Sequence, residues 1–410
     1  MVRRFGRPLW LPLAFDRPGD GVAGRRSGRC IPGALLRFDE RLEATLGTRA
    51  DLTWVSERPY HLVLHEVHRC IRDPTVEEHV TVPIEEVKSP ATTFIKGHVE
   101  AVDVDDRRVE LTDGDSIEYD YLLVAIGSQT AFFHIDGLET HALTLKSLDD
   151  ALAIHDALET ATESASMADP ARVVVGGAGQ TGVQVAGEVA AYREETSSPI
   201  EVVLIEGLET VLPGATRSFQ AAIRQRLEAR SIDVRTGSFV RAVDDERVHF
   251  DDGHDLAYDV LVWAGGITGQ RAMRDVGVDR DQKSNRLKTA TTFQTDDERV
   301  FALGDAALVE QPGDDPAPPN AQAAWQAAEV AGENVARAIR GQPMKEWTHE
   351  DKGTLISVGD EAVAHDVVGL RNVVETFGGP AAVTLKKTVA ARWINTVAGP
   401  VAAARAFPDM

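Results

Sequence analysis

The sequence reads Arg172-Val-Val-Val-Gly-Gly-Ala-Gly-Gln-Thr-Gly182 and then Val183-Gln-Val-Ala-Gly-Glu-Val-Ala190 over its most informative stretch. The apolar run predicts a buried strand, and a Gly-x-Gly-x-x-Gly turn at Gly177, Gly179 and Gly182 leads into a helix. The first glycine permits a tight turn, the second lets backbone approach a pyrophosphate, and the third lets the helix pack close to the strand. The helix N-terminus offers free N–H groups to the anion. The stretch therefore predicts a dinucleotide-binding unit; a glycine-rich structural turn is the alternative.

The next apolar run, Glu201-Val-Val-Leu-Ile-Glu206, predicts a second strand that ends in an acid. In dinucleotide-binding units a carboxylate at the end of this strand accepts a hydrogen bond from a ribose 2′-hydroxyl. Because a carboxylate also repels a 2′-phosphate, the sequence favours NAD(H) over NADP(H).

Length and charge limit the classes of protein that fit. The 410 residues suffice for two or three domains, and the net charge of −22 argues against nucleic-acid binding. The two cysteines form no Cys-x-x-Cys pair, which fits a reducing compartment such as the cytoplasm. No apolar run reaches the length of about 18 residues that a membrane span needs. Strong acidity with few lysines is typical of proteins from a salt-rich, halophilic cytoplasm.

Residues 1–36 do not match the rest of the chain. They hold seven arginines and two acids, and they show neither a strand nor a helix periodicity. A helix predicted from Leu36 and a strand predicted over Asp51–Val55 are the back half of a βαβ unit whose front half is missing. We therefore hypothesise a frameshift that replaces a first strand and its glycine loop; a targeting or disordered extension is the alternative.

One architecture occurs twice along the chain. Each copy has a β-meander, a Tyr-Asp pair, an apolar strand and an Ala-x-Gly end, at Tyr119–Gly127 and again at Tyr258–Gly266. A third apolar strand ends at Asp305, where a carboxylate beside a glycine suits the hydroxyls of a ribityl chain; a helix-capping aspartate is the alternative. The helix predicted over Ala321–Ile339 has Asn320 as its N-cap, so its positive end favours negative charge on a reduced flavin.

Together these features resemble the flavoproteins with two dinucleotide-binding domains, in particular type II NADH dehydrogenases (NADH:quinone oxidoreductases) and their sulfide:quinone relatives. The resemblance covers about residues 37–370. Its best-matching segments are Val55-Ser-Glu-Arg-Pro-Tyr-His61, Leu122–Gly127, Val173–Glu188, Val262–Gly266, Leu303–Asp305 and Ala321–Gln322.

The resemblance implies an α/β fold of two Rossmann-like dinucleotide-binding domains, each three-layered with an inserted β-meander. The NADH domain is inserted in a discontinuous FAD domain, and a small C-terminal region follows. The predicted boundaries are residues 1–36 for the anomalous segment, 37–145 and 266–345 for the two parts of the FAD-binding domain, 146–265 for the NADH-binding domain and 346–410 for the C-terminal region.

The resemblance also implies the cofactors, FAD and NAD(H), and the site residues. Asp305 would hold the ribityl chain and Gly127 would lie beside FAD, while Gln322 and Gln326 would face the flavin and the quinone. The predicted catalytic residues are Gln184, Glu188, Gln322 and Gln326. The predicted cofactor-binding residues are Glu57, Ala125, Gly127, Gly177, Gly179, Gln180, Gly182, Glu206, Gly265, Gly266, Gly304 and Asp305.

Three departures from the family pattern affect these expectations. The glycine loop expected to bind the FAD pyrophosphate is not readable, and the acid expected at the FAD ribose falls at Ser56, with Glu57 beside it. The family's Gly-Val-Glu ends in Gln184 here, so this side chain cannot relay a proton and that role would pass to another group or to water. Glu188 is a candidate near the flavin; a structural helix residue is the alternative.

The sequence offers no dithiol relay and no recognisable metal site. No two cysteines are close in sequence, which argues against reduction of glutathione, lipoamide or thioredoxin, and Cys70 is expected to be a small buried residue. His61, His65 and His68 do not have the spacing of a zinc site, and we expect His61 to pack near the flavin.

The C-terminal stretch places Leu385, Val389, Trp393 and Val397 on one helical face. Such a face suits a helix that lies on a membrane surface near a lipid-dissolved quinone. Packing on the core, or on a second subunit of a homodimer, is the alternative.

The sequence as a whole predicts an FAD-dependent, non-proton-pumping NADH dehydrogenase. It would pass electrons to a membrane quinone or another small acceptor at the cytoplasmic face of the cell membrane. A soluble ferredoxin- or rubredoxin-type reductase is the alternative enzyme, and a non-catalytic NADH-binding module with a defective FAD site is the alternative outside enzymes.

Overall fold

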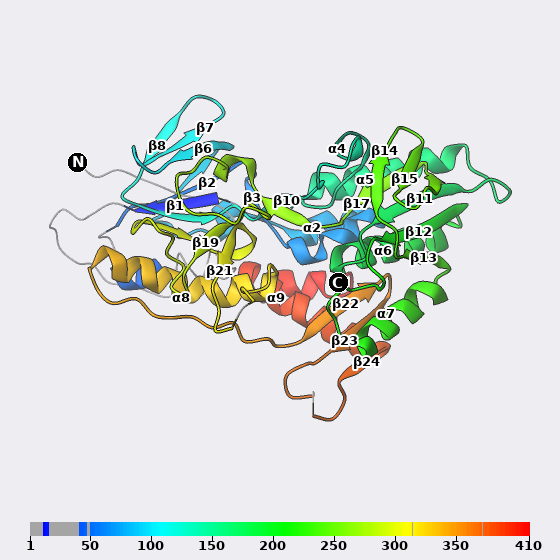
Figure 1. Cartoon of the computed structure of the whole chain (residues 1–410). Helices are drawn as coiled ribbons and strands as arrows, with labels where there is room; N and C mark the ends of the chain where they lie inside the picture. Colours follow the sequence, from blue (N-terminus) through cyan, green and yellow to red (C-terminus); the bar gives the residue numbers. More distant parts are fainter. Residues whose placement is uncertain (1–10, 16–40, 47–49, 314, 371) are drawn as a thin grey trace.

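The computed structural model describes residues 11–15, 41–46, 50–313, 315–370 and 372–410. Two α/β units and a C-terminal region make up the described chain (Figure 1). The mixed α/β architecture with parallel sheets confirms the predicted fold class. The predicted domain boundaries stay our proposal.

The glycine motif lies in a sheet of four parallel strands in the order β13-β12-β11-β17. Strands β11, β12 and β17 contain runs of Val, Ile and Leu because both of their faces are covered, whereas the edge strand β13 alternates apolar and polar residues. The strands are β11 (Ala171–Gly176), β12 (Ile200–Glu206), β13 (Ile232–Thr236) and β17 (Val260–Trp263). The helices of this unit are α5 (Leu148–Glu163), α6 (Gln180–Thr196) and α7 (Arg217–Ala229).

The other unit has a five-stranded sheet in the order β20-β9-β1-β2-β5. Its strands are β1 (Leu11–Phe15), β2 (Leu52–Ser56), β5 (Thr93–Lys96), β9 (Tyr121–Ala125) and β20 (Val300–Ala302). The long helix α8 (Ala321–Ile339) belongs to this unit, and the Asn320 side chain caps it by accepting a hydrogen bond from the Ala323 N–H. Residues 41–46 are helical. The strands predicted after residue 50 and the capped helix are therefore confirmed.

Strand β1 is a difference from the sequence-based expectation. Residues 1–36 show no strand periodicity, yet β1 lies between β2 and β9 and is antiparallel to both. Its last residue, Phe15, pairs with Leu52 and Tyr121, which begin β2 and β9. The end of β1 therefore lies at the opposite sheet edge from Ser56 and Ala125. The remainder of the segment, and with it the question of a first glycine loop, lies outside the described residues.

Both predicted meanders are present, one in each unit. The first consists of β6 (Val99–Asp103), β7 (Arg108–Leu111) and β8 (Ser116–Glu118), and the second of β14 (Val240–Val243), β15 (Arg247–Phe250) and β16 (Asp255–Ala257). The two units are joined by an antiparallel pair, β10 (Ser128–Thr130) with β18 (Ile267–Gly269). The chain thus leaves the first sheet after β9 and returns after β17 through adjacent strands.

Short elements complete the two units. They are β3 (Tyr60–Leu62), paired with β4 (Thr81–Pro83), the 3₁₀ segments η2 (Leu64–Ile71), η3 (Pro74–Val76), η4 (Arg271–Met273) and η5 (Gly304–Ala306), the helices α2 (Glu77–Val80), α3 (Ile84–Val87) and α4 (Leu138–His141), and β19 (Leu287–Thr289), paired with β21 (Ala307–Val309).

The C-terminal region packs on both units (Figure 1). It contains the antiparallel strands β22 (Thr354–Val358), β23 (Glu361–His365) and β24 (Thr376–Gly378), followed by α9 (Pro380–Ala406), which is kinked at Gly399. Trp393 and Val397 are buried in the core, whereas Val389 is exposed. The face predicted to lie on a membrane is therefore largely covered by protein, so packing on the core, the alternative, describes this part of α9.

Candidate functional site between the two units

The glycine turn has the shape that a dinucleotide requires. Gly177 has a φ of +94°, and a Cβ there would lie 2.5 Å from the Cα of Gly265. A Cβ on Gly182 would lie 1.8 Å from the Gly177 carbonyl oxygen, so the fold itself demands glycine at both positions. A Cβ on Gly179 would meet nothing within 4 Å. The open space beside Gly179 is where the phosphates of a nucleotide would approach the backbone.

Glu206 closes this turn from the neighbouring strand. It is the last residue of β12, and its carboxylate accepts hydrogen bonds from the N–H groups of Ala178, at 2.8 Å, and Leu208, at 3.0 Å. The carboxylate is thus held beside the glycine turn, where a ribose would follow the phosphates. Its role toward the ribose stays a prediction.

A central cavity of about 260 Å³ lies where the two units and the C-terminal region meet. It brings together six of the predicted site residues, which come from β9, α6 and the β20–α8 connection. They are Ala125, Gly127, Gln180, Gln184, Gly304 and Asp305. Three histidines and Trp393 complete one side of the wall, and Asn320 and Ala321 place the N-terminus of α8 on the other. A flat, largely apolar ligand with one charged end fits this lining.

Asp305 and Lys146 line the central cavity and form a small polar cluster with Ser128. Ser128 Oγ donates to Asp305 Oδ2 at 3.3 Å, and Lys146 Nζ donates to Ser128 Oγ at 3.1 Å. Burial lowers the pKa of Lys146, and the nearby Asp305 raises it. Hydroxyl-binding groups therefore lie beside the backbone of Gly304, which suits the ribityl chain expected there.

Glu57 lines a second cavity, of about 490 Å³, together with Ser56. The Glu57 carboxylate contacts the His98 ring at 2.9 Å and the Arg58 guanidinium at 3.4 Å. Ser56 Oγ accepts from the Arg58 N–H at 2.9 Å. The structure therefore places both candidates for the FAD ribose at one surface hollow.

Gln322 and Gln326 do not line the central cavity. Gln322 bonds the Gly353 carbonyl and the Lys352 N–H, at 3.1 and 2.9 Å. Gln326 bonds both backbone groups of Glu350, at 2.8 and 3.0 Å. The two amides hold residues 350–353 against α8, and a role facing the flavin and quinone stays a prediction. Gly265 and Gly266 are not lining residues of the cavity, and an added Cβ would meet the side chains of Trp263 and Phe133 respectively.

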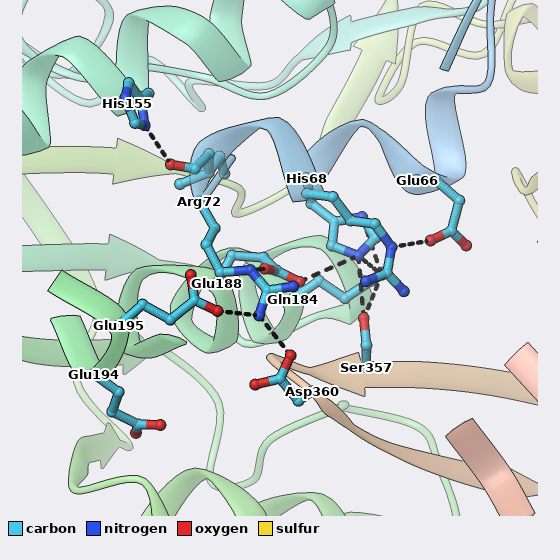
Figure 2. A network of polar contacts seen from close by, with 12 residues as sticks. Glu66, His68, Arg72, His155, Gln184, Glu188, Glu194, Glu195, Ser357 and Asp360 are labelled. Carbon is cyan, nitrogen blue, oxygen red and sulfur yellow. Dashed lines mark hydrogen bonds and ion pairs between the residues drawn. The ribbon is translucent and has the colours of Figure 1, made fainter. Parts of the chain in front are cut away.

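Glu188 lies behind the cavity wall in a polar network (Figure 2). Its side chain is fully buried, 3.2 Å from Arg72 Nε and 3.9 Å from His68 Nε2, and neither carboxylate oxygen has a hydrogen-bond partner among the described residues. Burial raises the pKa of Glu188, and Arg72 partly offsets this effect. Gln184, one turn earlier on α6, places its amide nitrogen 2.9 Å from His68 Nε2.

Sequence reasoning gave the three histidines no role beyond packing, although they line the cavity. Burial, with a smaller contribution from His65, lowers the pKa of His61 to about 3, so this ring is neutral. Neither nitrogen of His61 has a hydrogen-bond partner among the described residues. The available signal was the close spacing of the three histidines: His61 lies on β3, and His65 and His68 lie three residues apart on η2. In the described residues, no group of three or more His, Cys, Asp or Glu side chains is arranged to bind a metal ion.

Comparison with known proteins identifies a family and several similar proteins. The model of the family described as pyridine nucleotide-disulphide oxidoreductase matches residues 43–328. A type II NADH:quinone oxidoreductase of Staphylococcus aureus is 27% identical over 395 residues, which cover 89% of this chain and 93% of that protein.

Solved structures with this fold include NDH2 of Plasmodium falciparum in complex with NADH, with a TM-score of 0.76 and 19% identity over 90% of this chain and 96% of that one. The sulfide:quinone oxidoreductase of Aquifex aeolicus follows with a TM-score of 0.72 and 18% identity, covering 91% of each chain. A ferredoxin reductase of Rhodopseudomonas palustris has a TM-score of 0.63 and 18% identity over 81% of this chain and 79% of that one.

Proposed function

Because this chain belongs to the pyridine nucleotide-disulphide oxidoreductase family, an enzyme family that uses FAD and NAD(H), we propose that it oxidises NADH and reduces a quinone. The proposal is supported by the curated relative from Staphylococcus aureus, which is a type II NADH:quinone oxidoreductase and aligns along nearly its whole length. The domain limits given above from the sequence are part of this proposal.

The central cavity is the observation that carries the proposal. One side is built by Gly127, Gly304 and Asp305, the other by Gln180 and Gln184 of the helix that follows the glycine turn. A flavin ring held on the first side would lie next to a nicotinamide that reaches in from the second. When bound, FAD accepts a hydride from NADH and passes electrons to an acceptor.

The described residues fit the flavin ring and the ribityl chain. Asp305 offers a carboxylate for hydroxyls, and the N-terminus of the capped helix α8, which lines the cavity, would stabilise negative charge on a reduced flavin. The glycine turn of β11–α6 fits the NADH pyrophosphate because Gly179 leaves space beside its backbone. The turn that would bind the FAD pyrophosphate lies outside the described residues.

The C-terminal helix shapes the acceptor side of the cavity. Trp393 of α9 lines it and contacts the rings of His65 and Trp325, with centroids 5.6 and 5.3 Å apart. A wall of neutral histidine and tryptophan rings suits a flat, uncharged quinone better than a charged protein partner. Cys70 is buried, and burial raises the pKa of its thiol to about 12, so it is not a thiolate that could pass on electrons.

Peripheral attachment to the cytoplasmic face of the cell membrane is part of the proposal, because a quinone dissolves in lipid. In the described part of the chain, no helix has both the length and the apolar character to cross a bilayer. Exposed apolar side chains on α9 and the loop before β24, among them Val373, Val389 and Val401, offer a surface for shallow contact with lipid.

The test uses the purified 410-residue chain. We expect flavin absorbance that bleaches on addition of NADH, and more slowly with NADPH, because Glu206 would repel the 2′-phosphate. A short-chain quinone should restore the absorbance, whereas ferredoxin and rubredoxin should not. Restoration by these proteins but not by quinones would support the soluble reductase instead. Absence of flavin bands, with NADH binding retained, would support the non-catalytic module.

A further inference from the structure

His68 separates two cavities. It lines the central cavity, and its Nε2 lies 3.1 Å from Ser357 Oγ of β22. Ser357 lines a cavity of about 390 Å³ on the other side, which we name the C-terminal cavity. The C-terminal cavity is also lined by Arg69, Arg72, Glu195, Asp360 and Lys386. Ser357 Oγ also accepts from the Gln184 amide at 3.3 Å, so the Ser357 hydroxyl meets two side chains of the central cavity, His68 and Gln184 (Figure 2).

Solvent reaches the C-terminal cavity at its acidic rim. The side chains of Glu195 and Asp360 are 57% and 62% exposed, and both bind the guanidinium of Arg72, at 3.1 and 2.5 Å. The acids bind Arg72 at the rim, whereas Ser357, in the same lining, is buried. Protons from water can thus reach Ser357 without entering the central cavity.

The residues around His68 keep its ring neutral, and a carboxylate that could stabilise its protonated form lies nearby. Burial lowers the pKa of His68 well below its usual value, Lys386 lowers it further, and Glu66 opposes the shift. Arg69 and His65, also on η2, lower the His68 pKa as well. From α6, the Gln184 amide lies at 2.9 Å and the Glu188 carboxylate at 3.9 Å. One oxygen of the Glu188 carboxylate pairs with Arg72 at 3.2 Å, and the other is the one at 3.9 Å from His68, close enough to stabilise a protonated imidazole.

We propose that His68 carries a proton from solvent in the C-terminal cavity, through the Ser357 hydroxyl, to an acceptor in the central cavity. The inference rests on the proposed function. Reduction of a quinone by NADH takes two electrons and two protons: the hydride brings both electrons and one proton, and one further proton comes from water. Negative charge on the acceptor raises the proton affinity of His68, which then takes a proton from Ser357 as Ser357 takes one from water.

The proton balance closes within these groups. An N–H bond of the imidazolium breaks as an O–H bond forms on the acceptor, and His68 returns to the neutral form that its burial favours. Glu188 stabilises the short-lived cation and need not release a proton itself. NADH is the reductant and the quinone is the oxidant, so no further reactant is required.

The test compares His68→Gln with His155→Gln, a matched control. His155 is a half-buried histidine on α5 whose Nδ1–H donates to the Ile71 carbonyl oxygen at 3.0 Å, and it lines neither cavity. In rapid mixing, flavin reduction by NADH should be unchanged in both variants. Reoxidation by a short-chain quinone should fall by about 10²-fold in His68→Gln alone, the low end of what a positioned proton donor contributes.

Ferricyanide distinguishes proton delivery from a structural role, because it accepts electrons without protons. The rate at which His68→Gln reduces ferricyanide should stay within about twofold of the wild-type rate, since the variant loses only proton transfer, which ferricyanide does not need. Ser357→Ala should show the same pattern with a smaller loss, because a water molecule can occupy the space of the hydroxyl. An equal loss with quinone and ferricyanide would overturn the inference.

A readout without turnover comes from the histidine ring-nitrogen resonances of the cofactor-free chain. Ser357→Ala should shift the Nε2 resonance that His68→Gln deletes, and His155→Gln should leave that resonance in place. An unmoved resonance would show that Ser357 and His68 are not bonded, and would overturn the inference. A wild-type chain that reduces ferricyanide but no quinone would instead refute the proposed function, whereas undiminished quinone reduction by His68→Gln refutes the inference alone.

Discussion

Replacing Glu66 by glutamine should destabilise the protein more than replacing its partner Lys386 by methionine. Glu66 is 1% exposed and holds two cations: Lys386 Nζ of α9 at 2.7 Å and Arg69 Nε at 2.8 Å. At an effective dielectric constant of about 20, two unit charges 2.7 Å apart attract by about 6 kcal/mol before the cost of desolvation is subtracted. Glu66→Gln leaves both cations buried without their counter-charge, whereas Lys386→Met leaves Glu66 with Arg69.

Removal of one member of a buried pair typically costs about 3–5 kcal/mol. We expect the loss of unfolding free energy to be about 3 kcal/mol or less for Lys386→Met and about 5 kcal/mol or more for Glu66→Gln. The double variant Glu66→Gln/Lys386→Met should lose less than the sum of the two, because it removes the orphaned lysine as well. Guanidinium unfolding followed by tryptophan fluorescence measures these differences, since Trp393 lies on the helix that carries Lys386.

The same pair predicts a dependence of stability on pH. Burial alone would raise the pKa of Glu66, but Lys386 and then Arg69 outweigh burial and hold the Glu66 pKa below its usual value. A lowered folded-state pKa means that the stabilisation is present above the usual glutamate pKa and is lost as the pH falls toward the lower value. Glu66→Gln should remove this acid-side loss. A loss of unfolding free energy below about 1 kcal/mol for Glu66→Gln would refute the reasoning, because ion pairs exposed to solvent contribute that little. A larger loss for Lys386→Met than for Glu66→Gln would refute it as well.

Three further predictions concern the glycine turn, Asp305 and Cys70. Gly179→Ala should weaken NADH binding by at least about 10-fold in a titration, because its Cβ enters the open space beside the turn, and should leave the denaturant midpoint of unfolding unchanged. Gly182→Ala should also lower this midpoint, because its Cβ meets a carbonyl oxygen. Asp305→Ala should weaken flavin binding by about 10- to 100-fold in absorbance titrations, as expected for loss of a charged hydrogen-bonding group, with exposed Asp315→Ala as the control that should bind normally. Cys70 in the native protein should resist alkylation and react on unfolding, because burial raises the pKa of its thiol to about 12; rapid native labelling of the Cys70 peptide by mass spectrometry would contradict this.

Features with a local physical cause could be predicted from the sequence. The glycine turn at Gly177 and Gly182 results from close backbone approaches that leave no room for a Cβ, so these positions can be recognised in the sequence as glycines. The capped helix from Ala321 to Ile339 was predicted to the residue, because Asn320 and the glycine and proline beyond its end mark the two limits. The repeated meanders were predicted for the same reason, since alternating residues and Asp-Gly turns are local signals.

Features that depend on distant partners could not. An apolar helical face looks the same whether lipid or protein covers it, and only the contacts of Trp393 with His65 and Trp325 show that the core covers this one. The contact between His68 and Ser357 joins residues 289 positions apart, and no sequence pattern in either segment predicts it. The sequence of β1 has no alternation of apolar and polar residues that predicts a strand, and its place in the sheet follows only from its pairing with β2 and β9.

The bond between Lys386 and Glu66 also sets an order of events during synthesis. The two residues are 320 positions apart, and at a translation rate of roughly 5–20 residues per second about 16–64 s separate their emergence from the ribosome. Until α9 arrives, Glu66 must remain hydrated or rely on Arg69 alone, and the central cavity lacks the wall that Trp393 supplies. The nascent chain can therefore build its NADH-binding sheet early, but the acceptor pocket closes last, so a chain whose synthesis stops short of α9 would be left with its reactive centre open to water.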